Sequence, residues 1–273
     1  MVSETYPELL SLALDLAELA QEQILPRYLH CAVRIKGDGS EVTEADRAAE
    51  AAMRKRILER CPGHSILGEE YGPEGVAGAR FQWLLDPVDG TASFTIGVPL
   101  FGTLVGLLDE GRPVVGVIHL PGIRETVYAA RGHGCWFQHG DSAPTQVTVE
   151  RRATLAESVV SATAVHSSDW LSKPGQTRYR VSAYVAGAGK FRFVPDCVQH
   201  ALVCRGRLQA ALDTLMNPWD IAAVVPCVEE AGGLATTASG RRESVIEGGS
   251  LLTSCGGTLH DEVVEILRPL PAD

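Results

Sequence analysis

Leucine recurs at helical spacing near the start of the chain. Leu9, Leu12, Leu16 and Leu19 stand three or four residues apart, and such positions share one face of an α-helix. The pattern predicts an amphipathic helix over residues 7–29, with its apolar stripe packed against a core.

A polar segment and a second helix are predicted next. Residues 35–42, which include Lys36, are interpreted as a mobile loop, because glycine and small polar residues interrupt regular structure. Thr43 stands three residues before Asp46 and precedes an alanine-rich run, which is typical of a helix N-terminal cap. We expect this helix to end near Cys61.

Apolar runs separated by turn residues predict strands in the middle of the chain. Residues 81–85 are apolar and aromatic and indicate a buried strand. Residues 103–108, 114–120 and 126–130 indicate an antiparallel meander, with a hairpin turn at 109–112.

The composition becomes polar near residues 141–144, where we expect a second half of the chain to begin. The elements predicted there are strands over 159–164, 208–212 and 251–254, and helices over 195–204, 218–231 and 259–267. This order of helices and mostly non-βαβ strands favours a layered α/β or α+β architecture over a doubly wound nucleotide-binding fold.

The composition disfavours several classes of protein. Apolar residues make up 45% of the 273 residues, but no apolar run reaches the ~18 residues that a membrane-spanning helix needs. A formal net charge of −10 disfavours non-specific binding to nucleic acid. The first residues are acidic and lack a basic segment followed by an apolar one, so we expect no signal peptide.

The chain has seven cysteines, and no two of them form a CxxC pair. Reduced thiols in a cytoplasm are the simplest interpretation of an odd number in a chain of this size. We expect these thiols to be partly buried and inert, since free cysteine is among the most buried residue types.

The strongest chemical signal is the sequence DPVDGT at residues 86–91. Asp86 and Asp89 repel each other unless a cation lies between them. Gly90 permits close backbone approach, and amides exposed after a tight turn can hold a phosphate oxygen. The pattern indicates a hard cation together with a phosphate, and the alternative is an Asp-Pro turn with a capping aspartate. A calcium-binding EF-hand loop is excluded, because its acids fall at alternate positions.

Two further segments could add acids to such a site. Glu69 and Glu70 lie in a glycine-bounded loop, where paired glutamates are ordinarily solvated. Asp220 follows Asn217 at the predicted start of an apolar helix, where an acid stabilises the terminus by ~0.3–1 kcal/mol. Taken singly, both segments also fit these structural roles.

Four motifs occur together in order: TEAD at 43–46, GEE at 68–70, DPVDGT at 86–91, and WD at 219–220 followed by EAGG at 230–233. The set resembles the inositol monophosphatase family of magnesium-dependent, lithium-sensitive phosphatases. This resemblance implies an α+β fold, a layered α/β/α/β/α sandwich, and a homodimer. Residues 1–145 would hold the metal site and a large antiparallel sheet, and residues 146–273 the substrate-recognition residues and the last metal ligand.

The resemblance also implies a role for each matching residue. The implied ligands of two or three Mg²⁺ ions are Glu69, Asp86, Val88 through its carbonyl oxygen, Asp89 and Asp220. Asp86 would bridge two ions, of which one activates water and the other stabilises the leaving alkoxide. Thr91 and Asp46 would orient and deprotonate the attacking water. The amides of Gly90 and Thr91 would hold the phosphate, and Lys36 would lie near a weaker third metal position.

On the alcohol side, the resemblance places Asp196, Asp213 and Asn217 near the leaving group. Inositol-specific members have a small residue, Glu and His at these positions, so this chain departs from them at all three. An extra acid favours a cationic substrate, and histidinol phosphate carries an amine and an imidazole. Residues 86–108 are also more similar to the histidinol-phosphatase branch, although Val194-Pro195 replaces glycines that are common there.

We therefore predict histidinol phosphate as the small phosphorylated substrate, with inositol 1-phosphate and other sugar or nucleotide phosphates as alternatives. The alternative outside enzymes is an inactive member that binds a metal or a partner protein, which the presence of every expected acid disfavours. His133, His139, His166 and His200 lack ligand spacing to these acids and are interpreted as non-catalytic.

Overall fold

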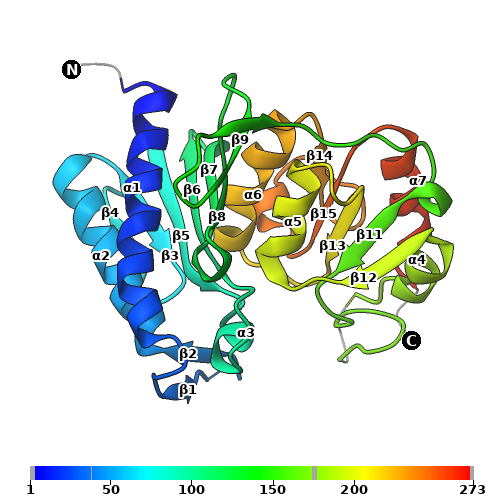
Figure 1. Cartoon of the computed structure of the whole chain (residues 1–273), viewed down its shortest axis with the longest axis horizontal. Helices are drawn as coiled ribbons and strands as arrows, with labels where there is room; N and C mark the ends of the chain where they lie inside the picture. Colours follow the sequence, from blue (N-terminus) through cyan, green and yellow to red (C-terminus); the bar gives the residue numbers. More distant parts are fainter. Residues whose placement is uncertain (1–3, 38, 174–176, 271–273) are drawn as a thin grey trace.

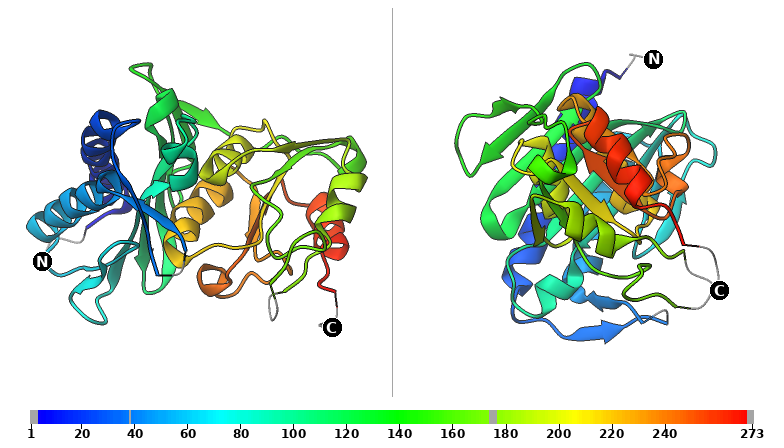
Figure 2. Two further views of the ribbon diagram at one scale, coloured as in Figure 1. Left: turned by 90° about the horizontal axis from the view of Figure 1, so that it is seen from below. Right: turned by 90° about the vertical axis from the view of Figure 1, so that its right-hand side faces the viewer.

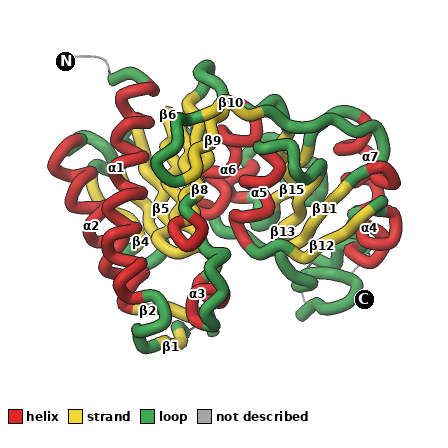
Figure 3. Tube along the Cα trace, in the orientation of Figure 1, coloured by secondary structure: helices red, strands yellow, loops and turns green. Residues whose placement is uncertain are grey.

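Helices and sheets alternate in layers in the computed structural model, which describes residues 4–37, 39–173 and 177–270 (Figures 1 and 3). One helix pair covers the outer face of a large sheet, and a second pair lies between this sheet and a smaller one. A third pair covers the outer face of the smaller sheet (Figure 2). The predicted α+β class and the α/β/α/β/α layering are confirmed.

All of the following helices except the short α3 belong to one of these layers. In chain order they are α1 (Tyr6–Ile24), α2 (Glu44–Arg60), α3 (Thr91–Thr95), α4 (Val181–Gly187), α5 (Asp196–Cys204), α6 (Pro218–Glu230) and α7 (Thr258–Ile266). Helices α1 and α2 form the first layer, α5 and α6 the middle one, and α4 and α7 the last. Within the described ranges, no helix is long and apolar enough to cross a bilayer.

The sheets are mixed. From edge to edge, the large sheet contains β10 (Thr145–Val147), β9 (Cys135–His139), β8 (Glu125–Ala130), β7 (Arg112–Leu120), β6 (Gly102–Asp109), β5 (Phe81–Asp89), β3 (Ser65–Gly68) and β4 (Gly72–Gly75). The smaller sheet contains β12 (Lys190–Phe193), β11 (Val159–Ala162), β13 (Ala210–Asp213), β15 (Leu251–Ser254) and β14 (Leu234–Thr236). Strand β3 is parallel to β5, and β11 is parallel to both β12 and β13.

The predicted meander is confirmed. Strands β6, β7 and β8 are consecutive antiparallel neighbours. The turn between β6 and β7 places Glu110 at φ 50° and Gly111 at φ 79°, and two consecutive positive φ values are typical of a tight hairpin turn. The second predicted helix is α2, and Thr43 caps it as its spacing to Asp46 indicated.

Several predictions were wrong in their extent, and the strand predicted over residues 81–85 runs on to Asp89. The first helix ends at Ile24 and not near residue 29, because Pro26 has no backbone N–H to continue the α-helical hydrogen bonds and the chain continues as a short 3₁₀ turn. Residues 35–42 are not wholly a loop, since β1 (Val33–Ile35) and β2 (Glu41–Thr43) form a hairpin. The β-branched residues of these two strands favour strand pairing, whereas the polar residues between the strands favour a turn.

Helix α6 packs directly on the large sheet at two glycines. A Cβ atom at Gly116 would overlap the carbonyl oxygen of Ala223, and a Cβ atom at Gly106 would lie 2.7 Å from that of Ala222. Neither glycine has a positive φ, so close approach of the helix explains them. This contact sets the height of α6 above the sheet, and Asp220 lies in the first turn of that helix.

Candidate active site

Three aspartates from distant parts of the chain meet between the large sheet and α6. Asp86 and Asp89 lie at the end of β5, and Asp220 lies at the start of α6. One carboxylate oxygen from each lies within 4.8 Å of the other two. The aspartates predicted from three separate positions of the motif set are therefore close enough to share one cation.

Burial and proximity disfavour the charged forms of these aspartates. Burial, followed by the charges of Glu69 and Asp89, raises the pKa of Asp86 well above its usual range. Burial and the charge of Asp220 raise the pKa of Asp89 to about 7, and burial raises the pKa of Asp220 to about 7. A cation among the oxygens would reverse these shifts, and Mg²⁺ prefers oxygen ligands. The donor set therefore fits a magnesium site.

Backbone amides orient two of the carboxylates. The N–H of Val88 donates to Asp86 Oδ1 at 3.0 Å. The N–H of Cys197, in the first turn of α5, donates to Asp89 Oδ2 at 2.6 Å. Because Cys197 belongs to the second half of the chain, this bond joins the end of β5 to a helix of the middle layer.

Asp220 combines a structural and a chemical position. The N–H of Asn217 donates to its Oδ2 at 2.7 Å, which is the capping contact considered from the sequence. The same carboxylate belongs to the aspartate cluster. Helix capping and membership of the cluster are therefore compatible at this residue.

Glu69 lies in a loop that a buried ion pair supports. Glu50 is fully buried, and it accepts hydrogen bonds from the N–H of Glu70 and from Arg54 Nε, both at 2.7 Å. A Cβ atom at Gly68 would overlap the Glu50 carboxylate, so only glycine fits there. Glu50 and Arg54 are not recognisable from the sequence as supports of the site, because their four-residue spacing is also that of an ordinary surface ion pair.

Lys36, beside strand β1, binds this glutamate loop. Its Nζ lies 2.8 Å from Glu69 Oε1 and 2.6 Å from Glu70 Oε1. Burial lowers the pKa of Lys36, but the hydrogen bonds to both glutamates outweigh burial and raise it above its usual range. Lys36 therefore places a fixed positive charge beside Glu69.

Asp46 and Thr91 lie next to each other, as the motif set predicted. Asp46 is fully buried, and its Oδ2 accepts bonds from the N–H and hydroxyl of Thr43 at 2.8 and 2.5 Å. Its Oδ1 lies 3.3 Å from the Thr91 hydroxyl, which also lies 2.9 Å from the Val88 carbonyl oxygen. One oxygen of Asp46 thus caps α2 and the other contacts Thr91.

Gly90 and Asp196 are in contact at the start of α3. Gly90 has φ 82°, and a Cβ atom there would lie 2.6 Å from Asp196 Oδ2. Asp196 itself has φ 51°, a conformation that is uncommon for residues other than glycine. Burial, followed by the charges of Asp89 and Asp213, raises the pKa of Asp196 to about 8.

A cavity of about 310 Å³ opens beside the aspartate cluster. Its acidic residues are Asp89, Asp196, Asp213 and Asp220. Both predicted alcohol-side acids thus face the same cavity as two predicted metal ligands. Asn217 is not among its lining residues, whereas Thr163 and His166, which the sequence analysis did not place at the site, are. Both belong to the loop after β11, where no motif marks them.

The sequence profile of the inositol monophosphatase family matches residues 6–271. The chain belongs to the inositol monophosphatase family. A histidinol-phosphatase of Chlorobaculum parvum is 38% identical over 90% of this chain and 91% of that protein. A histidinol-phosphatase of Mycobacterium tuberculosis is 35% identical over 95% of this chain and 97% of that protein.

Other relatives share the fold or carry a different name. An inositol-1-monophosphatase of Caulobacter vibrioides is 32% identical over 85% of this chain and 89% of that protein. The crystal structure of the extragenic suppressor protein suhB from Bartonella henselae superposes with a TM-score of 0.82, at 24% identity, over 95% of this chain and 98% of that one. As a member of the inositol monophosphatase family, the chain is a phosphomonoesterase of a metal-dependent type.

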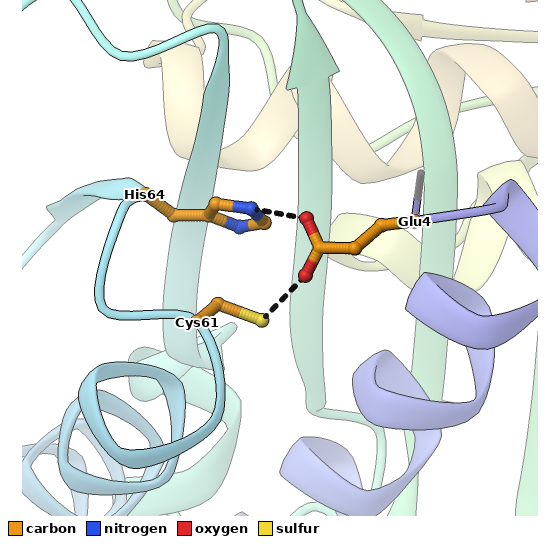
Figure 4. A group of neighbouring side chains, drawn as sticks. All are labelled: Glu4, Cys61 and His64. Atoms are coloured by element: carbon orange, nitrogen blue, oxygen red, sulfur yellow. Dashed lines mark hydrogen bonds and ion pairs between the residues drawn. The ribbon is translucent and has the colours of Figure 1, made fainter. Parts of the chain in front are cut away.

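This member of the inositol monophosphatase family has a second group of possible metal ligands (Figure 4). The two oxygens of Glu4 lie 2.9 Å from His64 Nε2 and 3.5 Å from Cys61 Sγ. His64 Nδ1 lies 3.1 Å from the indole nitrogen of Trp83, which can only donate. Nδ1 must therefore accept, and the proton of the neutral imidazole lies on Nε2, where a metal would have to displace it. The group anchors the N-terminal segment.

We expect the Cys61→Ser variant to respond to Zn²⁺ like the unaltered protein. Burial, followed by the charge of Glu4, raises the pKa of the Cys61 thiol to about 11, so little thiolate exists at neutral pH. Thermal unfolding of both proteins with equimolar ZnCl₂ measures this. Zinc bound at the aspartates affects both proteins equally, whereas stabilisation that disappears with Cys61 would contradict the anchor interpretation.

Proposed function

We propose that the chain hydrolyses a small phosphate monoester with Mg²⁺ held by the aspartate cluster. The observation that carries this proposal is the convergence of Asp86, Asp89 and Asp220 within 4.8 Å, with all three pKa values raised. Buried like charges are costly unless a cation compensates them. Glu69 and the Val88 carbonyl oxygen are the further ligands we propose, for a total of two or three ions.

The residues around the cluster have proposed roles in hydrolysis. Bound magnesium supplies Lewis acidity toward water and toward the oxygen of the leaving alcohol. We assign Thr91 to orient the attacking water and Asp46 to accept its proton, since their oxygens lie 3.3 Å apart and burial raises the pKa of Asp46 toward that of a base. The amides of Gly90 and Thr91, at the start of α3, are assigned to the phosphate oxygens. Lys36 stays the predicted neighbour of a third ion.

For the alcohol we propose histidinol, so that the substrate is histidinol phosphate. Asp196 and Asp213 add carboxylates to the cavity beside the cluster, and a protonated amine of the substrate would pair with such groups. His166 in the same cavity adds a further polar side chain. Two of the relatives described above are histidinol-phosphatases, which supports the same substrate.

Inositol 1-phosphate is the second candidate substrate, because the Caulobacter relative is an inositol-1-monophosphatase. A neutral polyol would leave the charge of Asp213 without a partner, and we therefore rank it second. A homodimer stays a prediction from the family resemblance, and a cytoplasmic location stays a prediction from the cysteine content.

Phosphate release from a substrate panel tests the proposal. We expect Mg²⁺-dependent release from histidinol phosphate with kcat/KM at least about tenfold above that for inositol 1-phosphate, since one charge-assisted hydrogen bond is worth about 1.5–3 kcal/mol. The same panel in excess EDTA is the control and should release almost none. Preference for the inositol ester would overturn the assignment of histidinol phosphate as the substrate. Phosphate release without metal would overturn the assignment of the aspartate cluster as the metal site.

A further inference from the structure

Three donors converge on one oxygen of Asp213, at the end of β13. Its Oδ2 lies 2.6 Å from Gln199 Nε2, 3.1 Å from His200 Nε2 and 3.1 Å from Thr163 Oγ1. Gln199 and His200 are consecutive residues of α5, and Thr163 follows β11. Elements of the middle layer and of the smaller sheet therefore hold a single carboxylate.

One arrangement of protons satisfies this whole network. A carboxylate only accepts, so His200 must carry a proton on Nε2, and its Nδ1 can accept from the hydroxyl of Thr253 at 2.8 Å. One amide proton of Gln199 points at Asp213, while the other lies between Thr163 Oγ1 at 2.8 Å and the Leu212 carbonyl oxygen at 3.2 Å. The network is satisfied with a neutral imidazole.

The two donors on α5 are themselves buried and held by further hydrogen bonds. Gln199, His200, Ser161 and Thr253 are all fully buried. The hydroxyl of Ser161 donates to the side-chain oxygen Oε1 of Gln199 at 2.7 Å, which sets the amide so that its NH₂ group faces Asp213. Buried polar groups with satisfied partners have one defined arrangement, so the direction of the two α5 donors is fixed before any ligand arrives.

This support leaves the negative charge of Asp213 available. Among the described residues, the only ion pair of Asp213 is with His200, which can act as a neutral donor, and Asp213 lines the cavity beside the aspartate cluster. An arginine or lysine partner would have neutralised the carboxylate. Hydrogen bonds from neutral groups orient Oδ2 but leave the carboxylate with its negative charge. Oδ1 has no hydrogen-bond partner among the described residues.

Thr163 links this carboxylate to the second acid of the cavity. Its hydroxyl can donate to Asp213 while it accepts from the backbone N–H of Asp196 at 3.0 Å. Asp196 has the uncommon φ of 51° noted above, so a hydrogen bond to its backbone helps to hold that conformation. One hydroxyl therefore fixes the relative position of the two alcohol-side acids.

We propose that Thr163, Gln199 and His200 are positioning residues that hold Asp213 as an oriented anion for a cationic group of the leaving alcohol. This inference rests on the proposed phosphomonoesterase function and assigns to these residues the preference for amine-bearing esters. They act through Asp213 and contact no reacting atom. His200 has no ligand spacing in the sequence, but in the fold it acquires a role in recognition.

Kinetics with two matched esters test the assignment. O-phosphoethanolamine carries an ammonium where propyl phosphate carries a methyl group, so the ratio of their kcat/KM values reports recognition of charge. Because one hydrogen bond to a charged group is worth roughly tenfold, we expect Thr163→Val and His200→Met each to lower this ratio about tenfold, mainly through KM of the ammonium ester. Thr163→Ser and His200→Gln, which keep a donor, should restore most of it.

The chain offers a matched control for the loss of a buried histidine. His260 is also buried and lies between two hydroxyls, Ser254 Oγ at 2.8 Å and Thr236 Oγ1 at 3.1 Å, but it does not line the cavity. His260→Met should leave the ratio unchanged. An equal loss with both esters in Thr163→Val and His200→Met would show a merely structural role and overturn the assignment.

A structural measurement separates failure of this inference from failure of the proposed function. In crystals of the Thr163→Val/His200→Met double variant, we expect the Asp213 carboxylate to leave its original orientation. An unchanged carboxylate would overturn the positioning role whatever the protein hydrolyses. Absence of turnover with every ester would contradict the proposed function alone, since the crystallographic result needs no activity.

Discussion

Replacement of Asp89 by asparagine is expected to lower kcat at least about 10³-fold while the protein stays folded. Removal of one carboxylate weakens the proposed metal site, and metal ions contribute several kcal/mol to such reactions, with each 1.4 kcal/mol equal to a factor of ten. The amide can still accept the N–H of Cys197, which lies 2.6 Å from Asp89 Oδ2. The orientation of the end of β5 should therefore survive.

The same change is expected to stabilise the metal-free protein at neutral pH. The pKa of Asp89 is about 7 in the folded protein and near its ordinary value of 3.8 when unfolded, so the folded state binds more protons between these values. The contribution of Asp89 to stability is full below about pH 4 and is lost as the pH rises through 7. Asparagine removes this loss, along with repulsion from Asp220.

Thermal unfolding at several pH values, with excess EDTA, measures the stability effect. We expect the unaltered protein to lose stability from pH 5 to pH 8 more steeply than Asp89→Asn, and the variant to unfold at least roughly 2 °C higher at pH 8. Asp141→Asn is a suitable control, because that side chain is 98% exposed. Full activity of Asp89→Asn, or lower stability without metal, would contradict the assigned role of Asp89.

The second large effect is expected from Gly116→Ala, far from the aspartates in sequence. The new methyl group would overlap the carbonyl oxygen of Ala223 and lie 2.8 Å from Pro226 Cγ. Backbone cannot rotate away as a side chain can, so α6 must rise from the sheet. Overpacking of a core costs about 1–3 kcal/mol, and we expect the upper end of this range.

Gly116→Ala should also raise the Mg²⁺ concentration that gives half-maximal activity, because Asp220 moves with α6. Chemical denaturation and a magnesium titration of turnover measure the two effects. Gly63→Ala serves as the control, since a Cβ atom there has no neighbour within 4 Å, and it should change neither. A destabilised Gly116→Ala protein with an unaltered magnesium requirement would show that α6 does not set the position of Asp220.

Much of the acidic site could be predicted from sequence, because its residues stand at the ends of strongly patterned elements. Asp86 and Asp89 lie at the end of an apolar strand, and Asp220 lies in the first turn of a largely apolar helix. Each signal was ambiguous alone, since capping and metal binding favour the same residue type. The structure shows why: Asp46 and Asp220 cap their helices and also face the site.

The support of the site could not be predicted in the same way. Contacts such as that of His200 with Asp213 connect a helix to a strand of another layer, and no spacing along the chain encodes that distance. Strand β3 has only four residues, too few for a periodic pattern. Asn217 stands at the expected position, but its backbone is engaged by Asp220 and it does not line the cavity.

The ion pair of Lys36 with Glu69 makes cation binding at that glutamate an exchange reaction. A divalent ion that binds Glu69 must displace the ammonium group of Lys36, which lies 2.8 Å away. The net gain of positive charge at the site is then one unit and not two. Lys36 lies in the connection between the two strands of the β1–β2 hairpin. Occupancy of the site and the position of this hairpin are therefore thermodynamically linked, and each shifts the equilibrium of the other.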